Sequence, residues 1–195
     1  AMPPDPVVGV LEAPSLQNLE RHIGDFTSAV AGGNQLGAPL MRVALMGLTY
    51  STNAGLIDSE KPFRIYLVRG AEGSLESVCA FSVKGPSAFR NSLRGDLKKV
   101  GDKDGVTTYE RSVQDFDRAA YMKATPEERK DIHKFIKTTT KPVFIGETET
   151  LICTGAHEAA MRSLMGLAVD GKLPETPLFG DADLSFWMNV QRLKT

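Results

Sequence analysis

The stretch "KPVFIGETETLICTGAHEAAMRSLMG", residues 141–166, holds an apolar strand pattern, a polar turn, a second strand pattern, a glycine and a helical pattern. The same order occurs in residues 61–95, which contain "KPFRIYLVRG" and "ESVCAFSVKGPSAFRNSLRG". Both segments begin with Lys-Pro, carry a cysteine in the second strand and have a glycine before the helix. We therefore predict one β-β-α unit that is used twice.

The residues before the first unit predict one strand and two helices. Residues 7–13, "VVGVLEA", favour a strand, and Pro14 begins a helix in which apolar side chains recur at helical spacing. The turn Gly32-Gly33-Asn34 is expected to end that helix. A second helix at about 38–51 is apolar almost all round, so we expect it to be the most buried element.

The residues around the second unit are more polar. An alternating strand is predicted at 105–112, and residues 113–124 are expected to cross the surface. Thr125-Pro126-Glu127-Glu128 is a capping box with proline at the first helical position, which predicts a helix at 126–138. The last strand, in "DADLSFWMNVQRL" (181–193), is either the closing edge of the sheet or the first strand of a further copy.

Together these elements predict an α+β fold with a mixed, mainly antiparallel sheet and helices packed on it. The order β-α-β-β-α-β is that of ferredoxin-like folds. We expect one domain, 1–195, made of a first β-α-α-β-β-α-β unit at 6–112 and a second part at 113–195. The second part holds the surface crossing, the basic helix and a β-β-α-β unit. No apolar run is long enough to predict a transmembrane segment.

The order of "IDSEKPFRIYLV", "AFRNSL", "GVTTYE" and "FIGETETLICTGAHEAAMRSL" resembles a group of uncharacterised bacterial envelope or secreted α+β proteins that share a domain of unknown function. The resemblance covers most of the chain and rests on element order. It implies a bacterial envelope or secreted location and brings no catalytic residues. The first residues, "AMPPDP", fit a chain whose leader has been removed, and a cytoplasmic location is the alternative.

Two cysteines, Cys79 and Cys153, lie in apolar strand patterns. Buried free thiols are our first expectation, and one disulfide between neighbouring strands is the second. Two cysteines are too few for a disulfide scaffold and lack the clustered spacing of a metal site. We therefore expect no cofactor and no metal.

Several catalytic motifs occur only in part. Cys153-Thr154-Gly155 lacks the aspartate of an acid protease, and His157-Glu158 is followed at the fifth position by Met161, where a zinc protease needs histidine. Gly-x-Ser-x-Gly and phosphate-loop spacings do not occur. The pairs Asp115/Asp117 and Asp181/Asp183 favour turns, and a glycosidase would need such carboxylates across a cleft.

Charge is distributed unevenly along the chain. The net charge is −3 for residues 1–81, +5 for 82–145 and −3 for 146–195, which gives −1 overall. A basic face for polyanions is one interpretation of the middle third, and a solvated mixed-charge surface is the other. The candidate binding residues are Arg90, Arg94, Lys98, Lys99, Lys103, Arg129, Lys130, Lys134 and Lys137.

From these patterns we expect a non-enzymatic binding or structural module of a bacterial envelope or secreted protein, with a protein or glycan as partner. One alternative is nucleic-acid or other polyanion binding through the basic middle third. The other is a hydrolase, a protease or glycosidase, whose site is built from dispersed carboxylates. The sequence leaves the oligomeric state open.

Overall fold

A computed structural model describes residues 5–30, 37–69, 74–174, 176–180 and 182–193. The strands are β1 (Val7–Ala13), β2 (Phe63–Arg69), β3 (Leu75–Phe81), β4 (Leu97–Lys103), β5 (Val106–Phe116), β6 (Ile136–Glu147), β7 (Ile152–Gly155) and β8 (Ser185–Met188). The helices are α1 (Leu16–Val30), α2 (Gly37–Thr49), α3 (Pro86–Asn91), α4 (Arg118–Lys123), α5 (Pro126–Arg129) and α6 (Glu158–Val169). Short 3-10 turns are η1 (Ala54–Leu56), η3 (Ile132–Phe135) and η4 (Val190–Leu193).

The strands form one eight-stranded sheet in the order β4-β5-β6-β7-β3-β2-β1-β8, and every ladder is antiparallel. The predicted α+β class is confirmed. The ferredoxin-like order is not confirmed, because β1 pairs with β2 and β8 and the sheet is larger than that fold requires. After β1, helices α1 and α2 bring the chain back to the same edge of that strand, so β2 pairs with β1 in the antiparallel direction. The expected division at 112/113 falls inside β5.

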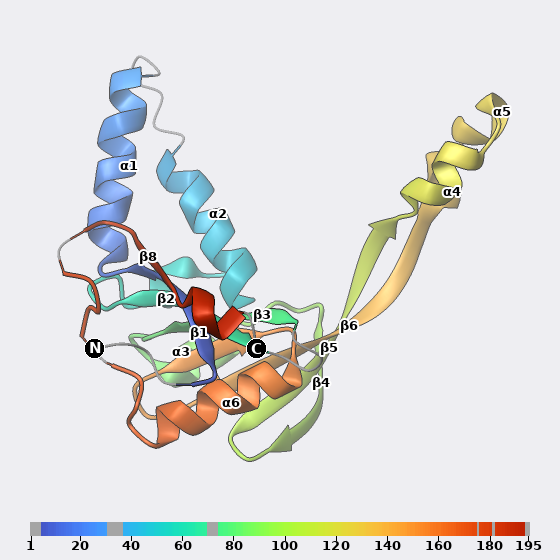
Figure 1. Cartoon of the computed structure of the whole chain (residues 1–195). Helices are drawn as coiled ribbons and strands as arrows, with labels where there is room; N and C mark the ends of the chain where they lie inside the picture. Colours follow the sequence, from blue (N-terminus) through green and yellow to red (C-terminus); the bar gives the residue numbers. More distant parts are fainter. Residues whose placement is uncertain (1–4, 31–36, 70–73, 175, 181, 194–195) are drawn as a thin grey trace.

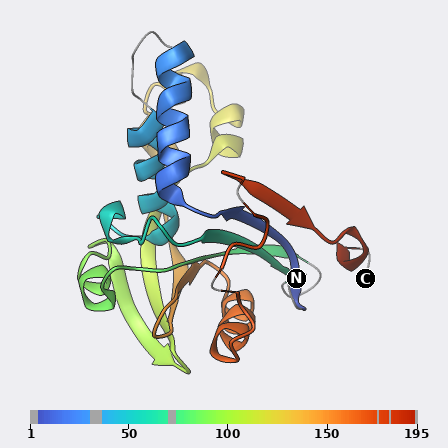
Figure 2. The same cartoon turned by 90° about the vertical axis from the view of Figure 1, so that its left-hand side faces the viewer.

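The repeated β-β-α unit is present as β2-β3-α3 and β6-β7-α6, and β3 and β7 join the two units at the centre of the sheet. Their helices lie on opposite faces. Phe89 of α3 packs with Phe81 on one face, whereas Met161 of α6 packs with Val78 and Cys153 on the other. Figures 1 and 2 show α6 beneath the sheet. The two copies therefore share an element order but cover different faces.

Both cores follow from the two-residue alternation of strands. In β3, Val78 and Ala80 face α6, while Cys79 and Phe81 face α2 and α3. The two cysteines lie on adjacent strands but on opposite faces of the sheet, and both are buried free thiols, as expected. Burial raises the pKa of each thiol to about 12.

The helices α1 and α2 form a hairpin that stands away from the sheet and approaches it only at one end (Figures 1 and 2). Among the described side chains of these two helices, only Leu16 and Leu45 belong to the buried core. The prediction that the second helix is the most buried element is wrong, because α2 leaves Leu40 67% and Val43 61% exposed. An apolar helix is buried only where another part of the protein packs against it. The predicted turn at 32–34 lies outside the described residues.

A second projection, here called the arm, is formed by β5 and β6 beyond their pairing with the rest of the sheet (Figure 1). Residues 112–116 and 136–140 pair only with one another among the described strands. The arm ends in α4, α5 and η3. Residues 113–124 are exposed or half-buried throughout, as a surface segment requires, but they form the end of β5 and α4 and project in the arm (Figure 1) instead of crossing the body.

The helix predicted at 126–138 begins where expected but ends early. Thr125 and Glu128 form the capping box, and α5 stops at Arg129. Its apolar residues Phe135 and Ile136 belong instead to η3 and β6. The last strand, β8, is the edge of the sheet beside β1, the first of the two interpretations above. Within the described ranges, every helix is too short or too polar to cross a membrane.

Candidate interaction surfaces

One face of α2 carries a charge-free apolar stripe of exposed residues. The stripe, which we call the α2 stripe, consists of Leu40, Val43, Ala44, Gly47 and Leu48. These positions follow the i, i+3, i+4, i+7, i+8 spacing and therefore lie on one side of the helix. Globular proteins seldom leave such a contiguous apolar surface in water without a partner. The α2 stripe is thus a candidate interface.

An apolar groove continues from the lower end of the stripe. Ala44 and Leu48 line it together with Leu11 and Ile65 on the sheet and with Leu184. Its volume is about 160 Å³, enough for one apolar side chain. The end of α2 is held beside this groove because the Thr154 hydroxyl donates a hydrogen bond to the Leu48 carbonyl at 2.8 Å.

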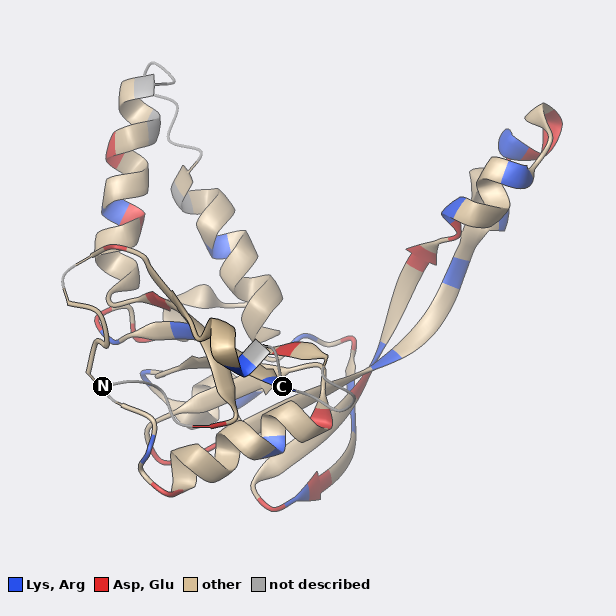
Figure 3. Ribbon diagram, in the orientation of Figure 1, with Lys and Arg blue, Asp and Glu red and all other residues tan. Residues whose placement is uncertain are grey.

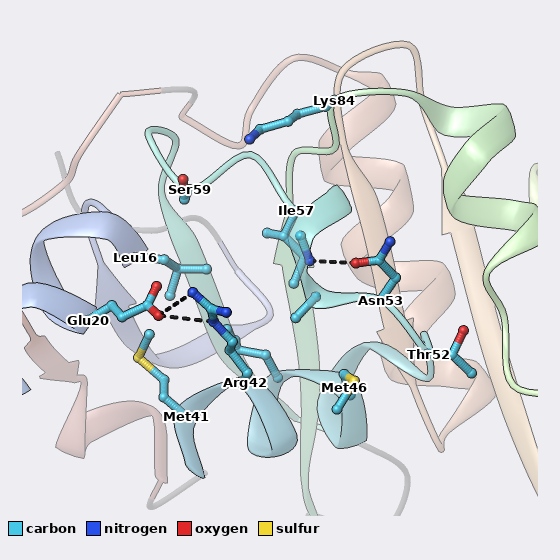
Figure 4. Close-up of a pocket in the computed structure, with 13 residues that line it drawn as sticks. Leu16, Glu20, Met41, Arg42, Met46, Thr52, Asn53, Ile57, Ser59 and Lys84 are labelled. Atoms are coloured by element: carbon cyan, nitrogen blue, oxygen red, sulfur yellow. Dashed lines mark hydrogen bonds and ion pairs between the residues drawn. The ribbon is translucent and has the colours of Figure 1, made fainter. Parts of the chain in front are cut away.

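A separate pocket of about 410 Å³ lies on the other side of α2, between α1, η1 and the turn before β2 (Figure 4). Its buried floor is apolar and is formed by Leu16, Leu45 and Ile57. Polar groups surround the floor, and Glu20 and Arg42 form an ion pair at 2.7 Å on one side. The other lining residues include Met41, Met46, Thr52, Asn53, Ser59 and Lys84.

The tip of the arm has a small core of its own. Phe116, Tyr121 and Phe135 form a ring cluster with centroid distances of 5.3 to 6.4 Å. The Arg129 guanidinium lies 5.4 Å from the Tyr121 ring and donates to the carbonyls of Tyr121 and Met122. This cluster lies at the tip of the arm, far from the body of the protein (Figure 1), where both basic and acidic residues occur (Figure 3).

The predicted basic residues fall into two groups that do not form one face. Arg90, Arg94, Lys98, Lys99 and Lys103 lie on and around α3 and β4, whereas Arg129, Lys130, Lys134 and Lys137 lie at the end of the arm (Figure 3). Most already have an internal partner.

Within the first group, Arg90 pairs with Glu147, Arg94 with Asp96 and Lys99 with Asp102. At the arm tip, Lys134 lies 3.7 Å from Asp131 and Lys137 lies 2.6 Å from Asp117. Among the described side chains, the lysines of the set without an ion pair are Lys98, Lys103 and Lys130. Polyanion binding by the set remains a prediction.

The residues of these incomplete catalytic motifs make contacts that stabilise the fold. Thr154 of the Cys-Thr-Gly sequence is the residue that binds the Leu48 carbonyl. His157 precedes α6, and its Nε2 lies 2.6 Å from Glu76. His22 contacts Asp183. Within the described ranges, no three His, Cys, Asp or Glu side chains come close enough to hold a metal ion.

The first predicted carboxylate pair lies at the junction of the arm and its tip. Asp115 pairs with Lys141 and accepts a hydrogen bond from Thr139. Asp117 caps α4 and pairs with Lys137. These donors hold the pKa of both carboxyls below the ordinary value. Asp181, of the second pair, lies outside the described residues.

Comparisons with known protein families, with curated proteins and with solved structures find no match to this chain. Sequence patterns alone did not identify the α2 stripe or the pocket. The available signal for the stripe was the near absence of charge in α2, where Arg42 is the one charged residue. The pocket brings together residues from separate elements and has no local sequence signature.

Proposed function

We propose that this chain is a non-enzymatic binding and structural module that assembles by packing α2 against the α2 helix of a second copy. The observation that carries this proposal is the α2 stripe, which is exposed, apolar and without charge. A helix that stands away from its own sheet with such a stripe is typical of a helix–helix contact.

The order of side-chain sizes along the stripe favours a second copy as the occupant. When α2 is laid antiparallel on itself about a two-fold axis between Val43 and Ala44, these two residues oppose each other. In the same register Leu40 opposes Gly47. Leu40 and Val43 then each meet a small side chain, which permits close packing of the helices. A parallel arrangement would instead place Leu40 against Leu40.

A two-fold axis repeats each of these contacts, so one stripe supplies both sides of the interface. Burial of an exposed leucine or valine is worth about 1.5–3 kcal/mol. Because association itself costs several kcal/mol, we expect a reversible dimer with a dissociation constant on the order of micromolar or weaker. The arm leaves the sheet at another place than α2 (Figure 1), and we assign it to a protein or glycan partner.

Sedimentation velocity between about 1 and about 200 μM tests the proposal, because mass action must increase the dimer fraction with concentration. We expect Val43→Glu to be monomeric throughout this range. Val169→Glu is the matched control, since Val169 is also exposed, at 74%, but lies on α6. A wild-type chain that stays monomeric at the highest concentration, or equal effects of both variants, would contradict the proposal.

Two earlier expectations remain proposals beside this one. The bacterial envelope or secreted location is supported by the resemblance of the sequence. Polyanion binding is the second candidate function, and it is supported by the three lysines without ion pairs, Lys98, Lys103 and Lys130.

A further inference from the structure

The pocket between α1, α2 and η1 combines an apolar floor with polar groups whose donors are unused. Leu16, Leu45 and Ile57 are each no more than 7% exposed and form the floor. A volume of about 410 Å³ lies within the range of sites that bind small molecules. The pocket faces away from the α2 stripe, so its occupancy is independent of the proposed dimer.

Backbone hydrogen bonds hold the walls in place. The Ser59 carbonyl accepts from the Gln17 amide at 3.1 Å and from the Ser15 hydroxyl at 3.1 Å, which fixes the start of α1 against this turn. The Lys84 amide donates to the Leu56 carbonyl at 2.9 Å, which fixes the Lys84 backbone against η1. A pocket whose walls are fixed in this way loses little conformational entropy when a ligand binds.

The polar groups around the floor are mainly donors. Among the described residues, the Lys84 ammonium group has no ion-pair partner, and the Ser59 hydroxyl and the Asn53 amide nitrogen make no hydrogen bond. Figure 4 shows Lys84 and Ser59 at one edge of the pocket, Asn53 on another side, and the Glu20–Arg42 pair between α1 and α2. Arg42 is already neutralised by Glu20, at 2.7 Å, so among the described residues that line the pocket Lys84 is the charge without an ion-pair partner.

We propose that this pocket binds a small amphipathic anion, a medium-chain carboxylate in the simplest case, with its negative group beside Lys84 and its apolar part on the Leu16, Leu45 and Ile57 floor. The cation provides a charge-assisted hydrogen bond, and Ser59 offers a further donor at the same edge. The thioethers of Met41 and Met46 adapt to apolar groups of different shape.

Titration with octanoate tests this assignment, with octylamine and octanol as probes of equal chain length. Methyl-labelled methionine NMR reports the position, because Met46 lines this pocket whereas Met161, on α6, is buried in the core on the opposite face of the sheet. We expect octanoate to shift the Met46 methyl signal without shifting that of Met161. Octanol should bind at least about tenfold more weakly, as loss of a hydrogen bond to a charged group predicts, and octylamine more weakly still.

Lys84 is tested by Lys84→Gln and by the conservative Lys84→Arg. Lys84 is exposed, so neither substitution should impair folding. We expect Gln to weaken octanoate about tenfold and to leave octanol unchanged, and Arg to retain most of the affinity. Equal binding of octanoate and octylamine, no Met46 shift with octanoate, or unchanged octanoate affinity in Lys84→Gln would each overturn the proposal. None of these outcomes bears on the dimer, which is measured by sedimentation.

Discussion

Arg64 and Glu12 form a buried ion pair that holds the segment leading to β8. The Arg64 Nε donates to the Glu12 carboxylate at 2.6 Å, with side chains 4% and 0% exposed. Arg64 also donates to the carbonyls of Pro174 and Thr176, and Glu12 accepts from the Leu178 amide. The pair thus connects β1 and β2 to residues far along the chain.

Loss of one partner should therefore be costly. We expect Arg64→Met to lower the free energy of unfolding by about 3–5 kcal/mol, because it leaves the Glu12 carboxylate buried and unpaired. Replacing both residues by apolar ones should cost less. The control is Arg42→Met, which breaks the exposed pair with Glu20 and should cost less than about 1 kcal/mol. Urea unfolding measures all three, and equal losses for the two arginine variants would contradict this view of the pair.

Alkaline conditions should destabilise the protein through its buried thiols. Burial raises the pKa of Cys79 and Cys153 from 9.0 to about 12. Between these two pH values both thiols are protonated in the folded state and ionised in the unfolded state. The stability contributed by these groups is full below about pH 9 and decreases as pH rises toward about 12. Urea midpoints across this range should therefore fall. The Cys79→Ala/Cys153→Ala variant should show a shallower decline, and an identical slope would refute the assignment.

Gly146 should not tolerate a side chain, because α6 approaches β6 closely there. A Cβ at Gly146 would overlap the Met165 side chain, which is 4% exposed. We expect Gly146→Ala to cost about 1–3 kcal/mol and Met165→Ala to relieve part of the overlap. Gly166→Ala is the control, since nothing surrounds that position and alanine should stabilise α6 by about 0.5–1 kcal/mol. An unchanged melting temperature for Gly146→Ala would show that α6 can move away from β6 at little cost, and would contradict this prediction.

Heparin affinity should be weak, since most of the nine predicted basic residues are paired internally and lie in two separate groups. We expect elution below about 200 mM salt. Lys98→Glu and Lys130→Glu probe one unpaired lysine in each group. Retention well above that salt concentration, with a steep loss in both variants, would instead favour the polyanion-binding alternative.

The sequence predicted the regular parts of the fold well. The strand at 7–13 is confirmed with the expected bounds, and so is the repeated β-β-α unit, because short apolar strand runs and glycine turns are local signals. The arm was missed for a physical reason. The capping box at Thr125 determines where α5 begins, but packing against Tyr121 places Phe135 in η3 and ends the helix early.

The candidate surfaces were harder to predict. The apolar pattern of α2 predicted a buried helix, yet burial depends on what lies opposite. The described part of the chain covers the side of α2 that carries Leu45 and leaves Leu40 and Val43 exposed. The pocket depends on Lys84, Ser59 and Asn53 meeting around one floor. The tertiary structure determines which residues from separate elements lie close together, and this proximity leaves no periodic signal in the sequence.

Cysteine cross-linking across the proposed two-fold axis tests the central claim most directly. The native cysteines are buried, so single cysteines introduced as Leu40→Cys and Gly47→Cys can be followed by mild oxidation. In the antiparallel register, neither variant alone should form a covalent dimer, because equivalent residues are about 10 Å apart along the axis. A mixture of the two variants should cross-link efficiently. Efficient cross-linking of Leu40→Cys alone, or no cross-link in the mixture, would contradict the pairing of α2 with itself.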